Sequence, residues 1–241
     1  MKEKVLLIIP AYNEEKVINK TYNTIIEYNK KMKTNYDVLV INDGSRDKTE
    51  KVLLENNIPH VALVSNLGIG GAVQTGYKYA LEHNYDIAIQ FDGDGQHDIN
   101  YIKKIIEPLV LNKADMVIGS RFINKKESKF QSSFSRRIGI RMISLLIRLK
   151  TKKRILDTTS GFRAVNKEII KEFASVYPLE YPEPISTVQL LTKKYRIEEV
   201  SVSMNERQEG VSSIKAWKSI YYMINVILTI ILMKKGDKNA K

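Results

Sequence analysis

The segment IAIQFDGDGQH, residues 87–97, joins a short apolar run to a cluster of polar side chains. Residues 87–91 are almost entirely apolar, which is typical of a strand that is buried on both faces of a parallel sheet. Residues 92–95 then alternate two aspartates with two glycines, where the backbone can turn sharply. A buried strand that ends in a polar turn predicts a ligand site at the carboxyl edge of an open α/β sheet.

The same alternation of apolar runs and helical segments extends through the first third of the chain. Further runs that suit buried strands occur at 5–9, 38–41 and 60–64. Apolar residues recur at helical spacing in the segments 14–31, 47–54 and 69–83. A fifth apolar run, at 116–118, leads into Gly119-Ser120-Arg121. This order predicts an α/β fold, with a mostly parallel, Rossmann-like sheet flanked by helices.

Polar side chains follow each of the first four predicted strands. They are, in chain order, Tyr12 and Glu14, Asp43, Asn66, and Asp92 with Asp94. Because the carboxyl ends of parallel strands meet at one edge, we expect a single site there. Asp94 and Gln96 offer the oxygen ligands that Mg²⁺ or Mn²⁺ prefers, and such an ion would neutralise a diphosphate leaving group. An ordinary surface turn is the alternative, since Asp-Gly pairs commonly form turns.

Other chemistries have little support in this sequence. The chain of 241 residues has no cysteine, which excludes disulfides and thiolate metal sites, and its three histidines are scattered. Neither a dinucleotide-binding fingerprint nor a nucleophile elbow occurs. The glycines at 68, 70 and 71 open a predicted helix, whose N-terminus can cradle a phosphate. No secretory signal precedes the first apolar run, which predicts a cytoplasmic start.

The net charge of +12 is concentrated in one segment. Residues 121–154 hold twelve lysines and arginines against one acid, Glu127, which indicates an anionic partner: nucleic acid, anionic lipid or a phosphorylated substrate. Within it, residues 138–149, IGIRMISLLIRL, are mostly apolar, with Arg141 and Arg148 seven positions apart. This pattern predicts an interfacial membrane helix. A core helix with two exposed arginines is the alternative.

A second apolar segment lies near the end of the chain. Residues 220–233 carry no charge over fourteen positions, whereas a spanning helix needs about 20 apolar residues. We therefore predict a helix that lies in the membrane interface or packs against a membrane partner. A short or tilted span is the alternative. From Gly236 onward the tail is predicted to be disordered.

Taken together, these motifs resemble family 2 glycosyltransferases with the GT-A fold. The resemblance rests on IPAYNEE at 9–15, VINDGS at 40–45, NLGIGGA at 66–72 and DGDGQH at 92–97. The stretches GSR at 119–121 and TSGFR at 159–163 resemble the branch that includes dolichyl-phosphate mannose synthase and bacterial undecaprenyl-phosphate glycosyltransferases. The resemblance implies a catalytic domain over residues 1–214, in which the segment 121–154 faces a membrane. An apolar helix and a basic tail follow over residues 215–241.

Roles at the matching positions follow from this resemblance. The nucleoside and donor would be held by Pro10, Ala11, Tyr12, Glu14, Asp43, Gly70 and Asp92. In many relatives an aspartate precedes Asp43, where this chain has Asn42. The metal, Mg²⁺ or Mn²⁺, would be bound by Asp94 and Gln96. Phosphates of the donor or acceptor would meet Arg121, Arg136 and Arg207, and Arg163 is a further candidate.

The acceptor determines which catalytic groups are needed. A lipid phosphate is already an anion, so positioning and charge neutralisation would supply most of the catalysis of an inverting displacement. With Asp94 and Arg136, Asp157 is a catalytic candidate, because relatives have an acidic residue proposed as base there. A helix cap or a partner for Arg163 is the alternative for Asp157. Glu183 is a second candidate base. No Glu-Asp pair follows the metal site, which favours a lipid-phosphate acceptor.

Three functions can be compared. The leading one transfers a sugar from UDP-glucose or UDP-N-acetylglucosamine to undecaprenyl phosphate at the cytoplasmic face of the membrane, for cell-wall or surface polysaccharide. A missing second membrane span suggests a small membrane-protein partner, and a homo-oligomer is left open. The alternative adds a sugar to a hydroxyl of a lipid-linked or cell-wall glycan. The third, nucleic-acid binding through residues 121–154, is disfavoured because aromatic residues for base stacking are not interleaved there.

Overall fold

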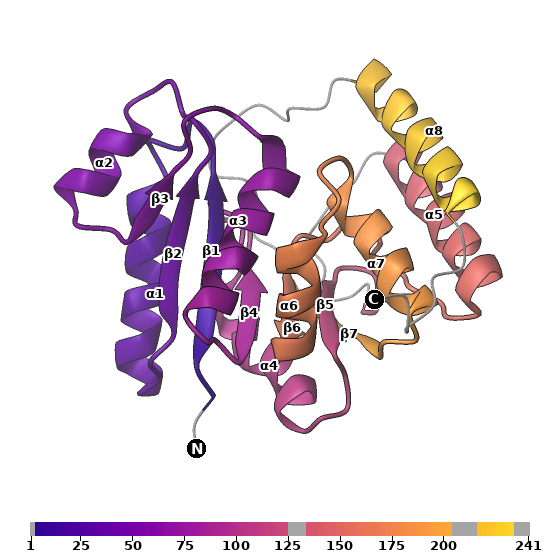
Figure 1. Ribbon diagram of the computed structural model, residues 1–241, viewed down its shortest axis with the longest axis horizontal. Coiled ribbons are helices and arrows are strands. Elements are labelled where there is room, and N and C mark those ends of the chain that lie inside the picture. The colour runs from indigo at the N-terminus through magenta and orange to yellow at the C-terminus, as the bar shows by residue number, and fades with distance from the viewer. Residues whose placement is uncertain (1–2, 125–133, 204–215, 234–241) are drawn as a thin grey trace.

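The computed structural model describes residues 3–124, 134–203 and 216–233, and its centre is a seven-stranded sheet in the order β3-β2-β1-β4-β6-β5-β7 (Figure 1). The strands are β1 (Val5–Ala11), β2 (Asp37–Asn42), β3 (His60–Ala62), β4 (Ile87–Gln90), β5 (Met116–Ser120), β6 (Arg163–Asn166) and β7 (Ile197–Ser201). The five strands predicted from apolar runs are all present, and β6 and β7 are additional.

One strand runs against the others. β6 pairs antiparallel with β4 on one side and with β5 on the other, whereas β1, β2, β3 and β4 pair in parallel. The first residue of β6, Arg163, therefore lies opposite Gln90, the last residue of β4. The reversal brings the loop before β6 to the edge at which β1, β2 and β4 end. The prediction of a mostly parallel sheet is confirmed.

Helices cover both faces of the sheet (Figure 1). Alternate residues of β1 enter two separate cores: Leu6 and Ile8 pack with α3 and α6, and Leu7 and Ile9 pack with α1 and α4. The helices are α1 (Ile18–Met32), α2 (Thr49–Glu55), α3 (Gly68–Glu82), α4 (Ile102–Val110), α5 (Phe134–Thr151), α6 (Lys167–Ser175), α7 (Pro182–Thr192) and α8 (Ala216–Leu232), with a short 3₁₀ helix at Ile99–Tyr101.

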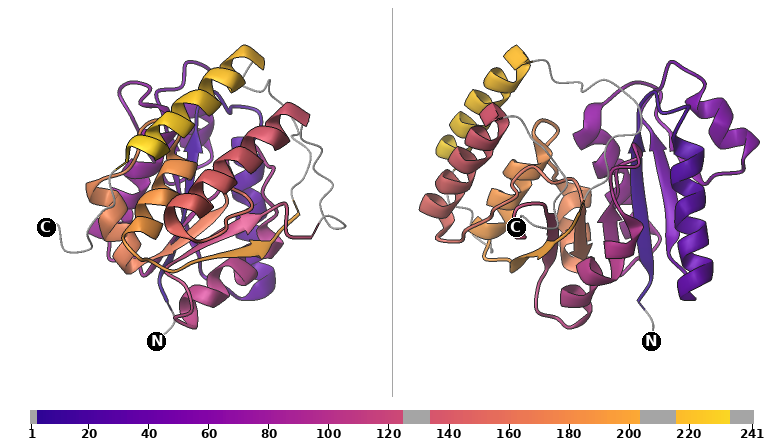
Figure 2. Two further views of the ribbon diagram at one scale, coloured as in Figure 1. Left: turned by 90° about the vertical axis from the view of Figure 1, so that its right-hand side faces the viewer. Right: turned by 180° about the vertical axis from the view of Figure 1, so that it is seen from behind.

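The helices α5 and α8 lie side by side and run in the same direction (Figure 2). In the first halves of the two helices Gly139 packs directly against Met223, where any side chain on the glycine would clash with the sulfur. At the other end the Lys150 ammonium donates to the backbone carbonyls of Ile230 and Met233. These carbonyls end a helix and lack partners within it, so a lysine there also complements the helix dipole.

Each of these two helices has one buried and one exposed apolar face. Ile140, Ile143 and Ile147 of α5 are buried, as are Val226 and Ile230 of α8. Outward-facing apolar residues are Ile138, Met142, Leu145 and Leu149 on α5, and Ile224, Leu228, Ile231 and Leu232 on α8. On α5, Arg141 and Arg148 are exposed beside them. The segment 138–149 therefore packs on the core and also exposes an apolar, basic face, and its contact with a membrane stays a prediction.

No helix in the described part of the chain is both long enough and apolar enough to cross a membrane. The prediction of a disordered tail after Gly236 lies outside the described residues.

Candidate active site at the carboxyl edge of the sheet

Asp43 joins the ends of three strands. Its backbone N–H donates to the carbonyl of Ala11 at the end of β1, 2.8 Å away, and its Oδ1 accepts from the N–H of Leu67, 2.7 Å away. The Asn66 amide donates to the Asp43 carbonyl at 3.1 Å. Burial raises the pKa of Asp43, while the N–H groups of Leu67 and Gly68 oppose that rise. The predicted convergence of these strand ends on one edge is confirmed.

Asn42 has a structural reason to differ from the aspartate that many relatives carry. Its side chain is buried, its amide donates to the carboxylate of Glu50, and its Oδ1 accepts from the Ser45 N–H at 3.2 Å. An aspartate here would place a second carboxylate against Glu50 without a donor between them. The amide therefore fixes the turn that presents Asp43.

The loop after β1 is tied to the loop after β2. The Asn13 N–H donates to Ser45 Oγ at 3.0 Å, and the Glu14 N–H donates to Thr49 Oγ1 at 2.8 Å. Tyr12, directly before these two anchors, is exposed. Pro10 and Ala11 form the last part of β1, next to Ile41 and Asn42 of β2. The residues predicted to hold a nucleoside thus share one end of the edge.

Gly70 lies where two segments meet closely. It belongs to the first turn of α3, and a side chain there would clash with the carbonyls of Pro178 and Leu179 in the loop before α7. Only a glycine allows that backbone approach. The loop before α7 is therefore packed directly on the glycine-rich turn that sequence reasoning assigned to the donor.

His97 holds Asp92 from two sides. The Asp92 N–H donates to His97 Nδ1 at 2.9 Å, so the proton of the neutral ring is on Nε2, which lies 3.2 Å from Asp92 Oδ2. The ring is stacked on Phe162, with 4.7 Å between centroids, and burial lowers the pKa of His97 to about 4. A neutral imidazole thus orients both the backbone and the carboxylate of Asp92.

Asp94 and Gln96 form the tight turn next to Asp92. Asp94 is 6% exposed, and its Oδ1 accepts from the Gln96 N–H at 3.0 Å. Gly95 between them has φ of 75°, which a residue with a side chain would rarely adopt. The Gly93 carbonyl accepts from Thr21 Oγ1 at 2.9 Å, which fixes the turn to α1.

The side-chain oxygens of Asp94 and Gln96 in this turn are donor atoms of the kind that a hard divalent cation prefers. Within the described residues, no group of three acidic or histidine side chains is arranged to hold a metal. Asp94 and Gln96 nevertheless fit Mg²⁺ or Mn²⁺ in the manner common for Mg²⁺, in which one or two protein oxygens are completed by water and substrate phosphates. A closed metal cage made only of protein would not fit this turn.

Arg121 and Asp157 form a buried ion pair beyond this turn. Asp157 is 0% exposed and Arg121 5% exposed, with 2.7 Å both from Nε to Oδ2 and from Nη2 to Oδ1. Two further N–H groups, of Leu156 and Asp157, donate to the carboxylate of Glu199 at 2.7 and 2.8 Å. The alternative that paired Asp157 with Arg163 is wrong, because its partner is Arg121. A base role for Asp157 stays a prediction.

Arg163 is enclosed by protein groups. It is 1% exposed, and its Nε donates to the Ser160 carbonyl at 2.7 Å. Its Nη1 donates to the Glu183 carbonyl at 2.8 Å and to Ser186 and Thr187. The guanidinium therefore ties the loop before β6 to the first turn of α7. Contact of Arg163 with a phosphate stays a prediction, and the geometry gives the residue a supporting position.

Two of the predicted phosphate ligands cannot be placed. Arg207 and the side chain of Arg136 lie outside the described residues. Three other residues were not singled out from the sequence: His97 as the support of Asp92, Gln90 at the end of β4, and Gly161. A side chain on Gly161 would come within 3.0 Å of Asp92 and 3.1 Å of Gln90. The signal for Gly161 was its place in the TSGFR stretch.

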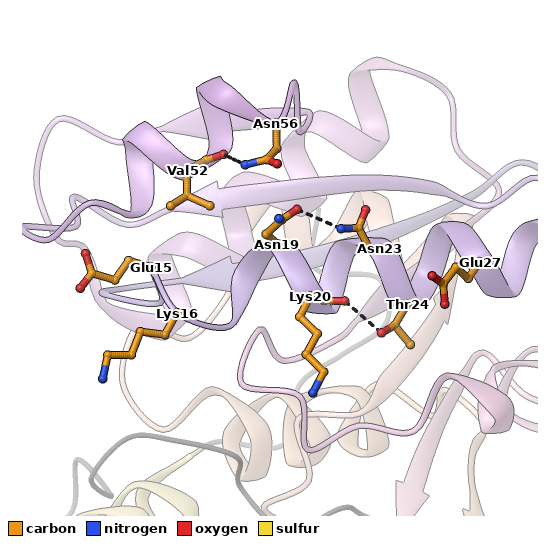
Figure 3. A pocket seen from close by; sticks show the side chains of 9 residues that line it. All are labelled: Glu15, Lys16, Asn19, Lys20, Asn23, Thr24, Glu27, Val52 and Asn56. Atoms are coloured by element: carbon orange, nitrogen blue, oxygen red, sulfur yellow. Dashed lines mark hydrogen bonds between the residues drawn. The ribbon is translucent and has the colours of Figure 1, made fainter.

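A surface hollow of about 620 Å³ lies over α1 and α2 (Figure 3). Its lining is formed by polar and charged side chains such as Lys16, Asn19 and Lys20, and several of its hydrogen bonds stay within one helix, for example Asn23 to Asn19. Asp43, Asp92 and Asp94 do not line it. The hollow therefore adds nothing to the site at the sheet edge.

Comparison with known proteins identifies the family of this chain. The model of glycosyl transferase family 2 matches residues 6–173, which include β1 to β6. The chain belongs to glycosyl transferase family 2. The resemblance seen in the motifs is thereby confirmed.

Two relatives within this family match nearly the whole chain. It is 33% identical over 216 residues to UDP-N-acetylglucosamine–dolichyl-phosphate N-acetylglucosaminyltransferase of Methanococcus voltae, covering 82% of this chain and 83% of the relative. It is 28% identical over 226 residues to undecaprenyl-phosphate mannosyltransferase of Micrococcus luteus, covering 87% and 86%. Both relatives are named as sugar transferases that use a polyprenyl phosphate.

A solved structure with the same fold is glucosyl-3-phosphoglycerate synthase from Mycobacterium tuberculosis, in complex with Mn²⁺, UDP and glucosyl-3-phosphoglycerate. It aligns with a TM-score of 0.68 and 16% identity, covering 99% of this chain and 82% of that one. At this identity the likeness shows the fold alone, an α/β fold of the GT-A type.

Proposed function

We propose that this family 2 enzyme transfers a sugar from a nucleotide sugar to a polyprenyl phosphate at a membrane surface, giving a lipid-linked monosaccharide. The observation that carries the proposal is the row of groups along one sheet edge. Asp43 stands at the end of β2, Asp92 and Asp94 follow β4, and Arg121 follows β5. Relatives that share most of the chain are named for polyprenyl-phosphate acceptors, which supports the acceptor class.

The donor lies across the edge in the order of the strands. Its nucleoside is held between the loops that carry Tyr12, Glu14 and Asp43, and its diphosphate lies at the turn of Asp92, Asp94 and Gln96. When bound, Mg²⁺ or Mn²⁺ neutralises the charge on the diphosphate leaving group. His97 keeps the Asp92 carboxylate turned toward the donor. The sugar then projects past β4 toward the loop before β6.

The acceptor oxygen attacks the anomeric carbon as the bond to the diphosphate breaks, which inverts the configuration. A phosphate monoester is already an anion, so the reaction needs little proton transfer, and cationic groups matter more. Arg121, Arg136 and Arg207 are the proposed phosphate ligands, and Asp157 keeps Arg121 in its orientation. If a base takes part, Glu183 is a better placed candidate than Asp157, because Asp157 is completely buried.

The exposed faces of α5 and α8 are the proposed membrane contact, on the cytoplasmic side. Apolar side chains such as Leu145 and Leu149 would enter the headgroup region, and Arg141 and Arg148 would meet anionic lipids. Helices of this kind lie in the interface. A small membrane protein that packs on the same face is a further proposal, motivated by the lack of a spanning helix among the described residues.

The proposed donors are UDP-glucose and UDP-N-acetylglucosamine. The latter is the sugar donor in the name of the Methanococcus voltae relative. The alternative function, in which a glycan hydroxyl accepts the sugar, uses the same donor site. It predicts a product with a saccharide acceptor and none with polyprenyl phosphate.

Product formation tests the proposal directly. The purified chain is incubated with vesicles that contain undecaprenyl phosphate, a panel of labelled nucleotide sugars, and Mn²⁺, Mg²⁺ or a chelator, and labelled lipid is measured. We expect a product that depends on the metal and is abolished by Asp94→Asn. The matched control is Asp86→Asn, which changes an aspartate at the opposite end of β4. Full activity of Asp94→Asn would contradict the metal assignment, and failure to label lipid with any donor would contradict the acceptor.

A further inference from the structure

Glu183 is held in place more rigidly than an ordinary surface carboxylate. It lies in the first turn of α7, and its carbonyl accepts from Arg163 at 2.8 Å, Thr187 at 2.7 Å and Ser186 at 3.3 Å. Tyr181, two residues before Glu183, has φ of 52°, which is an unusual backbone conformation for a tyrosine. Three donors on one carbonyl and a fixed turn define where the Glu183 side chain starts.

The carboxylate of Glu183 is surrounded by groups of the candidate site. It is partly exposed, it is hydrogen-bonded to the Gln90 amide, and it feels the charges of Arg163 and Asp92. Burial raises its pKa, and the charge of Arg163 opposes that rise. Gln90 is itself 1% exposed and lies opposite Arg163 in the sheet. Glu183 is thus the accessible end of a buried polar network.

The order of the strands locates this network relative to the donor. Along the edge, β2 is followed by β1, β4 and β6, so Asp43, Tyr12, Asp92 and the loop before β6 succeed one another. In a nucleotide sugar the diphosphate connects the nucleoside at one end to the sugar at the other. If the nucleoside lies by Asp43 and the diphosphate by Asp94, the sugar reaches the boundary of β4 and β6, where Glu183 stands.

The carboxylates at this boundary accept hydrogen bonds. Asp92 and Glu183 are carboxylates, whereas the guanidinium of Arg163 donates to five protein residues: Thr158, Ser160, Glu183, Ser186 and Thr187. Arg121, paired with Asp157, is the arginine proposed to meet the phosphates. Such surroundings favour a hydroxyl or N–H donor on the ligand. A carboxylate on the sugar would meet the like charges of Asp92 and Glu183 without a partner from Arg163.

We propose that Glu183 is a specificity-determining residue that accepts a hydrogen bond from a ring hydroxyl of the transferred sugar, so that the enzyme selects neutral sugars over uronic acids. The inference rests on the proposed donor site and names the sugar class that this site takes. Because an anionic acceptor needs little help from a base, Glu183 is available for this task.

Donor binding and turnover by the full chain test the inference. Affinities for UDP, UDP-glucose and UDP-glucuronate are measured with Mn²⁺ by calorimetry, and GDP, GDP-mannose and GDP-mannuronate form a parallel set. The variant is Glu183→Gln, and Glu180→Gln is the matched control, an exposed glutamate three residues earlier. Melting temperatures show whether each variant is folded.

Wild type is expected to bind the neutral sugar nucleotide at least about tenfold more tightly than its uronate. Glu183→Gln is expected to lose roughly 10–100-fold in affinity or kcat/KM for the neutral donor, with the ratio between neutral and acidic donors narrowed and the affinity for the free nucleotide unchanged. Glu180→Gln should behave as wild type. A structural role alone would lower nucleotide and sugar binding together and leave the ratio unchanged.

An unchanged ratio in a folded Glu183→Gln variant would overturn the inference, as would a wild-type enzyme that prefers the uronate or binds neither nucleotide set. Because donor binding needs no acceptor, the two proposals can fail separately. A shifted ratio without any lipid product would leave Glu183 in its role and refute the polyprenyl phosphate acceptor.

Discussion

Replacing Asp157 with asparagine tests whether this carboxylate supports Arg121 or acts as a base. Both side chains of the pair are almost inaccessible, at 0% and 5% exposure, and Asp157 accepts from the backbone N–H, the Nε and the Nη2 of Arg121. Removal of one charge leaves the other buried and unpaired. Breaking such a pair from one side costs about 3–5 kcal/mol.

Asparagine keeps one acceptor oxygen, so the expected loss lies near the lower limit, at about 3 kcal/mol. In a protein of this size each kcal/mol shifts the melting temperature by about 2–4 °C, which gives a fall of roughly 6–12 °C. The total stability of a domain is about 5–15 kcal/mol, so the variant should still fold at room temperature.

Calorimetric melting of the metal-free chain measures this loss, with Arg121→Gln and the double variant completing a cycle. If the two residues act as a pair, the double variant is less destabilised than the sum of the single variants, by about 1–3 kcal/mol. Asp86→Asn, at the opposite edge of the sheet, serves as control. Wild-type stability of Asp157→Asn together with lost turnover would refute the supporting role and favour the base.

Two further predictions concern pH and the membrane. The His97 pKa of about 4 lies below its unfolded value of about 6.5, so the unfolded chain binds the extra proton between these values. The metal-free chain should therefore lose up to about 3 kcal/mol as pH falls from 6.5 to 4. Urea unfolding at several pH values measures this loss, which His97→Phe should remove; the same slope in that variant would contradict the assignment. Leu145→Glu, on the exposed face of α5, should weaken binding to anionic vesicles by roughly 10–100-fold at unchanged melting temperature, because burial of a leucine is worth about 1.5–3 kcal/mol. Leu111→Glu, an equally exposed leucine after α4, should bind as wild type, and equal losses in both variants would contradict a membrane contact through α5.

Strands with continuous apolar runs could be predicted from the sequence, and the others could not. β1, β2 and β4 are buried along most of their length, so nearly every residue had to be apolar. β6 is only four residues long and begins with Arg163, whose charge is hidden by partners that are distant in sequence. β7 has two consecutive glutamates, because it is an edge strand and only its first residue is buried.

At the candidate site, most of the polar side chains could be predicted from the sequence, but not all of the residues that they contact. Asp43, Asp92 and Asp94 could be placed because each directly follows a predicted strand. The ion pair of Arg121 and Asp157 spans 36 positions and depends on how the loop before β6 folds back, which no local pattern encodes. His97 belongs to the DGDGQH motif, but its support of Asp92 could not be predicted, because no local pattern indicates that its ring stacks on Phe162.

The reversed direction of β6 bears on how new specificities can evolve in this enzyme. It divides the edge into a half built before residue 98, proposed to hold the nucleotide, and a half built after residue 118, proposed to adjoin the sugar and the acceptor. Several contacts join the two halves: His97 stacks on Phe162, Gly161 packs against Asp92, and Gly70 packs against Leu179. A chimaera joined within the loop after α4 would therefore have to preserve these contacts as well as the register of β4 and β6.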